Sequence, residues 1–258
     1  MARPDAKAFL WPGGRLAAVS LSWDDARASQ VDVGIPILDR HGIKGTFYVL
    51  PASLRLRIAK WRAAAAAGHE IGNHTVYHPC TGNFSWQTPR TMLENYTLER
   101  MEAELLLANK LIGAALGVIP TSFAYCCNQA FVGRGARAKS YVPLVARHFT
   151  AGRTGFSEVH NRPDRCDPAQ LCATDLDGKT FGEVRTEIEA AAAEGRWIIF
   201  AGHEVGRRGV RQTTSADMLD RLCAYLAGRP EIWADTISAI GRHVRATAKH
   251  PGMAIRRR

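Results

Sequence analysis

Two carboxylates and two imidazoles have the residue types and the spacing that hydrolysis at a metal ion needs. Asp24 and Asp25 are neighbours at the end of an apolar run, and His74 and His78 lie four residues apart further along the chain. Of two adjacent carboxylates, one can bind a divalent cation while the other stays free to accept a proton. Imidazoles four residues apart share one face of a helical turn, so both can bind a single ion. The pattern predicts a metal-dependent hydrolase.

Both segments resemble motifs of the polysaccharide deacetylase family, also called the NodB-homology domain or carbohydrate esterase family 4. Residues 22–26 read Ser-Trp-Asp-Asp-Ala and residues 74–78 read His-Thr-Val-Tyr-His, in the order of the family's first two motifs. The resemblance implies one divalent metal ion as cofactor, zinc or else cobalt or nickel. It also implies that Asp24 is the catalytic base and that the metal ligands are Asp25, His74 and His78.

Residues 121–128, Thr-Ser-Phe-Ala-Tyr-Cys-Cys-Asn, resemble the family's third motif, which forms a wall of the substrate groove. The resemblance implies that the backbone N–H of Cys127 faces the developing oxyanion. Many members have Arg, Pro and Gly where this chain has Ala124, Cys126 and Asn128. Because a cation beside a carboxylate lowers its pKa, the missing Arg leaves open what orients the catalytic base and compensates its charge.

An apolar run that ends in a histidine, residues 197–204, resembles the family's closing motif. The resemblance implies that His203 is the general acid, and an imidazolium suits this role because its ordinary pKa lies near neutrality. Residues 173–178, Ala-Thr-Asp-Leu-Asp-Gly, resemble the segment whose aspartate orients that histidine, and we expect Asp175 to be this residue. The run Asp-Leu-Asp-Gly is equally typical of a turn.

Apolar runs and amphipathic segments alternate along the chain, which predicts α/β architecture with a parallel sheet. The alternation alone also fits a doubly wound sheet, whereas the resemblance implies a distorted, incompletely closed (β/α) barrel with about seven parallel strands. The small, basic segment 133–139 predicts a mobile loop. We expect strands at residues 17–22, 45–50, 70–71, 121–125, 149–151, 197–201 and 232–233, and helices at 33–39, 54–67, 91–115, 142–147, 181–194, 216–226 and up to 243.

Length and composition are those of a globular enzyme. Barrels of 258 residues form single units, so we expect one polysaccharide-deacetylase-like catalytic domain over residues 1–258. No apolar run is long enough to span a membrane. The net charge is +10, but the basic residues, Arg256–Arg258 included, are scattered and not interleaved with aromatics. We therefore expect no nucleic-acid or membrane partner, while steering of an anionic substrate and the oligomeric state stay open.

The cysteines and the N-terminal residues give expectations about the cellular location of the protein. No apolar signal core follows Met1, which predicts a cytoplasmic protein. The six cysteines are thinly spread, and Cys126 and Cys127 are neighbours, so we expect all six to be thiols. No Cys-x-x-Cys pair occurs, which argues against a structural zinc finger.

The resemblance implies removal of an acyl group, acetyl above all, from an amino sugar or another carbohydrate. Alternatives are an amidohydrolase of the same fold that acts on cyclic ureides or other non-peptide C–N bonds, a carbohydrate-binding pseudoenzyme, and an Fe(II) oxygenase with a facial triad. The presence of base, ligands and acid argues against the pseudoenzyme, and the absence of His-x-Asp and His-x-Glu argues against the oxygenase. A zincin protease fails because His69-Glu70 is followed by His74, one residue too far for His-Glu-x-x-His.

Overall fold

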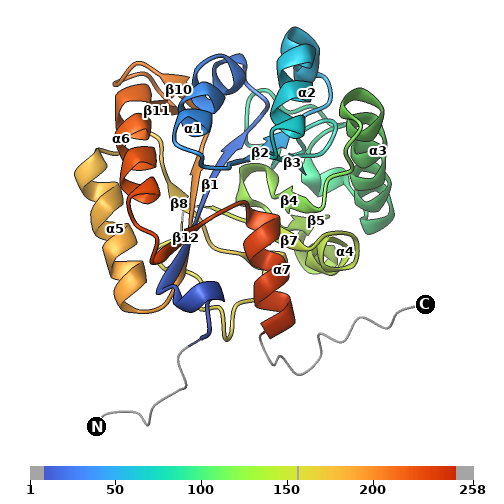
Figure 1. Cartoon of the computed structure of the whole chain (residues 1–258). Helices are drawn as coiled ribbons and strands as arrows, with labels where there is room; N and C mark the ends of the chain where they lie inside the picture. Colours follow the sequence, from blue (N-terminus) through green and yellow to red (C-terminus); the bar gives the residue numbers. More distant parts are fainter. Residues whose placement is uncertain (1–8, 156, 248–258) are drawn as a thin grey trace, which may run out of the picture.

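A parallel β-sheet forms the centre of the computed structural model, which describes residues 9–155 and 157–247 (Figure 1). Every pairing within this sheet is parallel. The strand order is β7 (Ala151–Arg153), β4 (Ser122–Ala124), β3 (Glu70–Asn73), β2 (Thr46–Val49), β1 (Ala17–Asp24), β9 (Trp197–Gly202) and β8 (Thr174–Asp175). An eighth strand, β12 (Ile232–Ala234), pairs with β1 beside this path.

Strand β1 is the central element, and all eight of its residues are buried. A run buried on both faces is typical of parallel strands that are covered by helices. One edge of β1 pairs with β9, whereas the other edge pairs with β12 over Ala17–Val19 and with β2 over Ser22–Asp24. The buried Ser22 hydroxyl donates a 2.7 Å hydrogen bond to the carbonyl of Phe200, so the polar group is satisfied inside the core.

The sheet curls but does not close into a full barrel. Its end strands are β7 and β8, which do not pair with each other in the described part of the chain, and Leu171 in the segment before β8 forms an isolated bridge with Arg153 of β7. The N–H of Leu171 donates to the carbonyl of Gly152 at 2.7 Å, and the carbonyl of Leu171 accepts from Thr154 at 2.8 Å. The predicted distorted, incompletely closed (β/α) barrel with about seven parallel strands is therefore confirmed.

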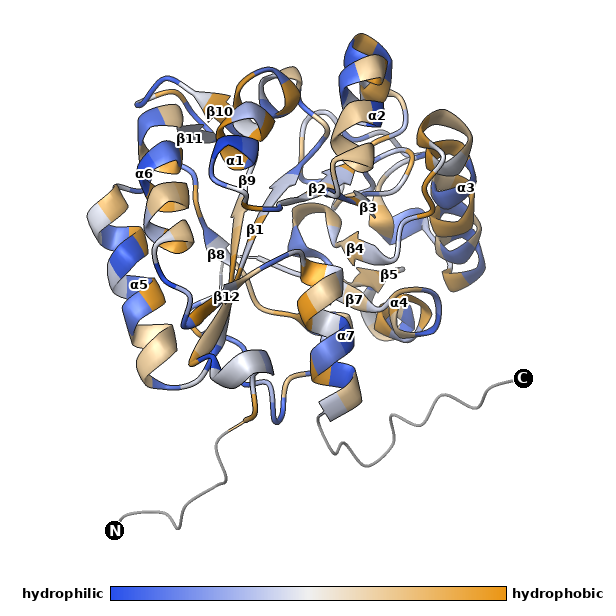
Figure 2. Ribbon diagram, in the orientation of Figure 1, coloured by the Kyte–Doolittle hydropathy of each residue, from blue (hydrophilic) through white to orange (hydrophobic). Residues whose placement is uncertain are grey.

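Amphipathic helices cover the outside of the sheet (Figure 1). In α6 the buried residues recur every three or four positions, at Met218, Leu219, Leu222, Cys223 and Leu226. Figure 2 shows the corresponding mixture of blue and orange residues along α5 and α6. The helices are α1 (Ile35–Arg40), α2 (Ile58–Ala66), α3 (Leu98–Leu116), α4 (Val142–His148), α5 (Phe181–Ala193), α6 (Ala216–Ala227) and α7 (Ile237–Thr247).

Two segments differ from the sequence-based expectation. The helix expected from residue 91 begins at Leu98, because the Thr97 side chain accepts a hydrogen bond from the N–H of Arg100 and caps the helix there. The segment expected to be a mobile loop is an ordered turn at Gly135–Arg137 between two short antiparallel strands. These strands are β5 (Phe131–Val132) and β6 (Lys139–Ser140).

Near the end of β9, two further short strands pair in parallel, β10 (Glu204–Gly206) and β11 (Thr213–Ser215). The loop between them, residues 207–212, is exposed. No helix within residues 9–155 and 157–247 is long and apolar enough to cross a membrane. Two sequence-based expectations concern residues outside the described part of the chain. They are the absence of a signal core, judged from Met1–Lys7, and the basic tail at Arg256–Arg258.

Candidate active site

The carboxyl ends of three strands bring the expected site residues together. Asp24 is the last residue of β1 and Asp25 follows it, His74 follows β3, and His203 follows β9. In parallel α/β folds these strand ends meet at one end of the sheet. A cavity of about 630 Å³ lies there, and its lining includes Asp24, Asp25, His78 and His203. The sequence-based prediction that these residues share one site agrees with the geometry.

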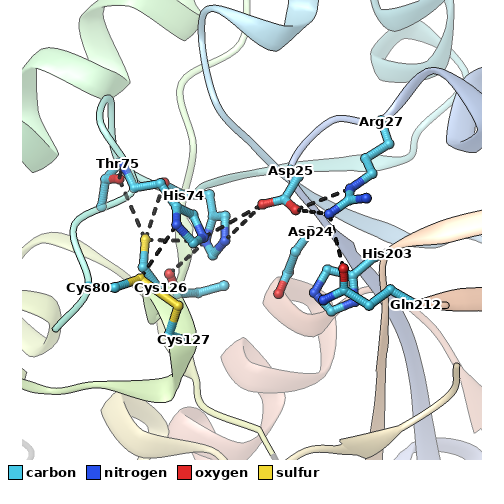
Figure 3. A network of polar contacts seen from close by, with 12 residues as sticks. Asp24, Asp25, Arg27, His74, Thr75, Cys80, Cys126, Cys127, His203 and Gln212 are labelled. Carbon is cyan, nitrogen blue, oxygen red and sulfur yellow. Dashed lines mark hydrogen bonds and ion pairs between the residues drawn. A yellow bond between two sulfur atoms is a disulfide. The ribbon is translucent and has the colours of Figure 1, made fainter. Parts of the chain in front are cut away.

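Asp25 faces His74 (Figure 3), and His78 lies near the same carboxylate oxygen. Oδ1 of Asp25 lies 3.6 Å from Nε2 of His74 and 3.7 Å from Nε2 of His78. In a tetrahedral zinc site, ligand atoms about 2.1 Å from the ion lie about 3.4 Å apart. Each of the two carboxylate–imidazole distances is therefore close to the distance between two ligands of one divalent ion such as zinc.

The two histidines converge from a loop and not from a helix. Thr75 and His78 have φ angles of 67° and 50°, which a right-handed helix does not allow. The loop that follows β3, and not a helical turn, therefore aligns the imidazoles. Nδ1 of His74 lies 2.9 Å from the carbonyl oxygen of Ala124. Donation to that carbonyl fixes the tautomer and leaves Nε2 with a lone pair for a metal.

A buried carboxylate on α3 holds the histidine loop in place. Glu104 is 5% exposed, and its Oε1 accepts hydrogen bonds from the N–H groups of Val76 at 3.2 Å and Tyr77 at 2.9 Å. The Tyr96 hydroxyl donates to Oε2 of Glu104 at 2.7 Å. Because a buried carboxylate needs such donors, the loop and α3 are tied together between His74 and His78.

Asp25 divides its two oxygens between two neighbours. Arg27 donates to Oδ2 at 2.9 Å, whereas Oδ1 faces the histidines. Arg27 also pairs with Glu204 at 3.2 Å, so it anchors Asp25 to β10. Asp25 and Ala26 have φ angles of 76° and 55°, an unfavourable conformation for residues other than glycine. Backbone strain of this kind is typical of functional sites.

Asp24 pairs with an arginine that the sequence analysis missed. Nη2 of Arg153, the last residue of β7, donates to Oδ1 of Asp24, and both side chains are buried. Arg153 stands beside Ala124 in the register of β4 and β7, so the cation comes from the next strand at the same level. Burial raises the pKa of Asp24, but Arg153, His74 and His203 outweigh it and lower the pKa to about 2.

His203 is held by Asp177 and not by Asp175. Its Nδ1 lies 2.8 Å from Oδ2 of Asp177, whose Oδ1 accepts from the Thr214 hydroxyl at 2.9 Å. Asp177 reaches this position because Gly202 has no side chain: a Cβ there would come within 2.9 Å of its Oδ1. The expectation for Asp175 is therefore wrong, and Asp175 lines the cavity instead. Although burial lowers the pKa of His203, the hydrogen bond to Asp177 and nearby carboxylates raise it overall.

Known proteins share sequence similarity with part of this chain. Residues 14–129 match the family described as polysaccharide deacetylase. The expected relationship to this family is confirmed. A Bacillus gellan lyase is 32% identical over 123 residues, 47% of this chain and 4% of that protein. The Listeria monocytogenes peptidoglycan-N-acetylglucosamine deacetylase PgdA is 26% identical over 105 residues, 40% of this chain and 20% of the relative.

Solved structures share the fold along nearly the whole chain. A Mycobacterium smegmatis protein assigned as a polysaccharide deacetylase has a TM-score of 0.70 at 19% identity and covers 98% of both chains. The PuuE allantoinase has a TM-score of 0.66 at 14% identity and covers 96% of both chains. By contrast, this chain spans 4% to 28% of the length of the curated relatives that it matches first.

The chain has a disulfide at the wall of the cavity. Cys127 lines the cavity and is bonded to Cys80, two residues after His78 (Figure 3). The expectation that all six cysteines are thiols is therefore wrong. The neighbours Cys126 and Cys127 do not exclude a bridge, because Cys127 pairs across the fold with a residue 47 positions away. The cytoplasmic location stays a prediction.

Sulfur atoms near the histidines do not compete well for a metal. Cys80 and Cys127 lie close to His78, but in a disulfide they offer no thiolate. Cys126 also lies near both histidines, and burial raises the pKa of its thiol well above the ordinary value. Its Sγ lies 3.9 Å from Nδ1 of His74, the nitrogen that faces the Ala124 carbonyl. Asp25 is therefore the better third ligand.

Proposed function

We propose that this chain is a metal-dependent hydrolase that removes an acyl group, acetyl above all, from an amino sugar or another carbohydrate. The observation that carries the proposal is one cavity at which three sets of groups meet: the donor set of Asp25, His74 and His78, the Asp24–Arg153 ion pair, and His203 with Asp177. Membership of the matched family supports carbohydrate deacetylation.

Asp24 is suited to be the general base. Its carboxylate is fixed by Arg153 on β7. Because its pKa is low, Asp24 is ionised at neutral pH. The ion pair with Arg153 also makes Asp24 a weaker base, because a stabilised carboxylate binds a proton less tightly. Its position at the cavity, beside the proposed ligand Asp25, supports a role in accepting a proton from an attacking water.

A divalent ion held by Asp25, His74 and His78 would supply Lewis-acid polarisation of the acyl carbonyl and activation of water. His203 is suited to be the general acid that donates a proton to the leaving nitrogen or oxygen. Asp177 binds Nδ1, so Nε2 of His203 is the nitrogen that can serve the substrate. The two environments lower the pKa of Asp24 and raise that of His203, which widens the range in which both have the required protonation states.

Hydrolysis of a cyclic ureide is the second candidate. The observation in its favour is the fold match to an allantoinase over 96% of both chains. The proposed metal, base and acid would serve either reaction, since both attack a carbonyl carbon and release a nitrogen. What differs is the rest of the cavity, where Phe84 and Trp86 offer stacked aromatic faces that suit a sugar ring.

The test is release of acetate from a panel of acetylated mono- and oligosaccharides, run beside cyclic ureides. Each reaction is measured with protein that has been loaded with zinc, cobalt or nickel and with the same protein after chelation. We expect acetate from at least one sugar, and the activity to be lost on chelation. Ureide opening without acetate would establish the second candidate, whereas no turnover of any compound by metal-loaded protein would contradict both. The variant Asp24→Asn is the matched control for contaminating activity.

A further inference from the structure

Three arginines line the proposed active-site cavity, and their partners differ. Arg153 is paired with Asp24, and Arg27 is paired with Asp25 and Glu204. No acidic side chain within residues 9–155 and 157–247 lies within 4.0 Å of the guanidinium of Arg211. Its positive charge is therefore directed at solvent and at whatever enters the cavity.

Arg211 belongs to a basic loop at the mouth of the cavity. The loop between β10 and β11 reads Arg-Arg-Gly-Val-Arg-Gln over residues 207–212 and is exposed. Arg208 and Arg211 border a second hollow of about 420 Å³ next to Asp177. The oxygens of Asp177 already accept hydrogen bonds from His203 and Thr214, so this carboxylate does not use Arg211.

An aromatic surface lies on another wall of the same cavity. Phe84 and Trp86 stack with ring centroids 4.3 Å apart and an interplanar angle of 26°, and both line the cavity. Although Trp86 stacks on Phe84, it is 59% exposed, which is unusual for so large an apolar side chain. These residues follow β3 whereas Arg211 follows β9, and the two strands lie on opposite sides of β1. A flat apolar face suits the C–H face of a sugar ring.

We propose that the substrate is an acylated sugar that carries an anionic group, a carboxylate or a phosphate, which Arg211 binds while Trp86 stacks on the sugar ring. The proposal rests on the hydrolase function proposed above and narrows its substrate class. A guanidinium binds either anion through paired hydrogen bonds. The net charge of +10 favours approach of such a substrate over a cationic one.

Charge within the cavity agrees with this selectivity. Asp24 and Asp25 are each neutralised by an arginine, and the proposed metal ion would add further positive charge. Asp175, the remaining acidic group of the lining, is half-buried, and burial raises its pKa. An anionic group that enters beside Arg211 thus meets a site with excess positive charge.

The experiment compares N-acetylglucosamine, N-acetylmuramic acid and N-acetylglucosamine 6-phosphate, which share the acetamide and differ in charge. Acetate release by the metal-loaded protein gives kcat and KM for each. We expect KM at least about tenfold lower for one or both anionic sugars than for the neutral sugar, as a charge-assisted hydrogen bond warrants. The arms with carboxylate and with phosphate show which anion is preferred.

Arg211→Ala should remove the preference by raising KM for the anionic sugars and leave kcat/KM for the neutral sugar within about twofold, while Arg211→Lys keeps part of it. Trp86→Ala should raise KM for all three sugars, and Trp86→Phe should restore most of the binding. Arg137→Ala, which makes the same charge change outside this cavity, should alter nothing. Equal KM values for the three sugars in the parent protein would overturn the inference and leave the hydrolase function intact. Absence of acetate from every substrate would instead contradict the hydrolase function.

Discussion

Two halves of the candidate active site are held by different kinds of interaction. The ligand half, which is Asp25, His74 and His78, is held by contacts within its own loops and also by distant groups, which are Glu104, the Ala124 carbonyl and Glu204. The N–H of Thr75 donates to the Asn73 side chain at 2.7 Å, and the N–H of His78 donates to the Thr75 hydroxyl at 3.0 Å. These two contacts span two or three residues, so the sequence of the histidine loop specifies part of its own shape.

The proton-transfer half, which is Asp24 and His203, depends on partners from distant parts of the chain. Arg153 is 129 residues from Asp24, and Asp177 is 26 residues from His203. Both pairs form because the carboxyl ends of β1, β7, β8 and β9 lie at the same end of the parallel sheet. The comparison shows that the ligand half combines local and distant contacts, whereas the two proposed proton-transfer groups each depend on a distant partner. Each prediction below separates the two halves.

The largest expected effect is loss of the metal when the ligand half is changed. Asp25→Ala and His78→Ala should each abolish tight binding of a divalent ion and lower kcat/KM for acetate release by about 10³-fold or more, because the Lewis acid is lost. Elemental analysis of purified variants measures the binding. Asp24→Asn is the matched control: it should keep the metal while kcat falls by about 10²- to 10⁴-fold, since the amide cannot accept a proton. Full metal content in both ligand variants would show that the ion binds elsewhere.

Removal of Arg153 should be the most destabilising change in the proton-transfer half. Arg153→Met leaves the Asp24 carboxylate buried without its partner, which costs about 3–5 kcal/mol in the free energy of unfolding. Urea denaturation measures this loss. The double variant Asp24→Asn with Arg153→Met should recover much of it, because no buried charge remains. If the two single changes and the double change are simply additive, the ion pair does not have the role assigned to it.

Loss of the disulfide should weaken the fold around the ligand half. Cys80 and Cys127 close a loop with a sequence separation of 47, for which the chain-entropy relation gives about 4 kcal/mol of unfolding free energy. Cys80→Ser and reduction of the parent protein should lower the unfolding free energy by similar amounts, and Cys172→Ser, a change at a free thiol, should not. Titration of six thiols in the denatured, non-reduced protein would show that the bridge does not form and would support the cytoplasmic prediction.

The smallest effect concerns the pH dependence of the general acid. Asp177 raises the pKa of His203, so Asp177→Asn should lower that pKa and deprotonate His203 at a lower pH. The basic limb of the profile of kcat/KM against pH should then shift to lower pH, with a loss of about tenfold on its alkaline side. Asp175→Asn is the control and should leave the limb closer to its parent position. Equal shifts in both variants would mean that Asp177 has no special role.

Most element positions could be predicted from the sequence, because apolar runs and helical periodicity are local properties. The segments expected at 142–147, 181–194 and 216–226, for example, correspond closely to α4, α5 and α6. The start of α3 was placed too early since the capping role of Thr97 is stronger than the apolar periodicity before it. Within the ligand half, sequence motifs located all three residues that the structure brings together.

Partners across the fold could not be predicted in the same way. Nothing in the spacing of residues 149–153 shows that Arg153 stands beside Ala124, because strand register is decided by the whole sheet. Asp175 and Asp177 both suited the role of orienting His203, and only the close approach that Gly202 permits distinguishes them. The Cys80–Cys127 bridge likewise joins two loops whose proximity no local pattern reveals.

The most direct test of the central claim is a zinc titration of the chelated protein in which bound metal and acetate release from an acetylated sugar are measured on the same samples. The account predicts that acetate release rises in proportion to bound zinc and reaches its maximum at one ion per chain through Asp25, His74 and His78. It also predicts that Asp24→Asn binds the same single ion without comparable turnover. Acetate release that is unchanged by chelation, or that does not rise as the single ion binds, would contradict the account.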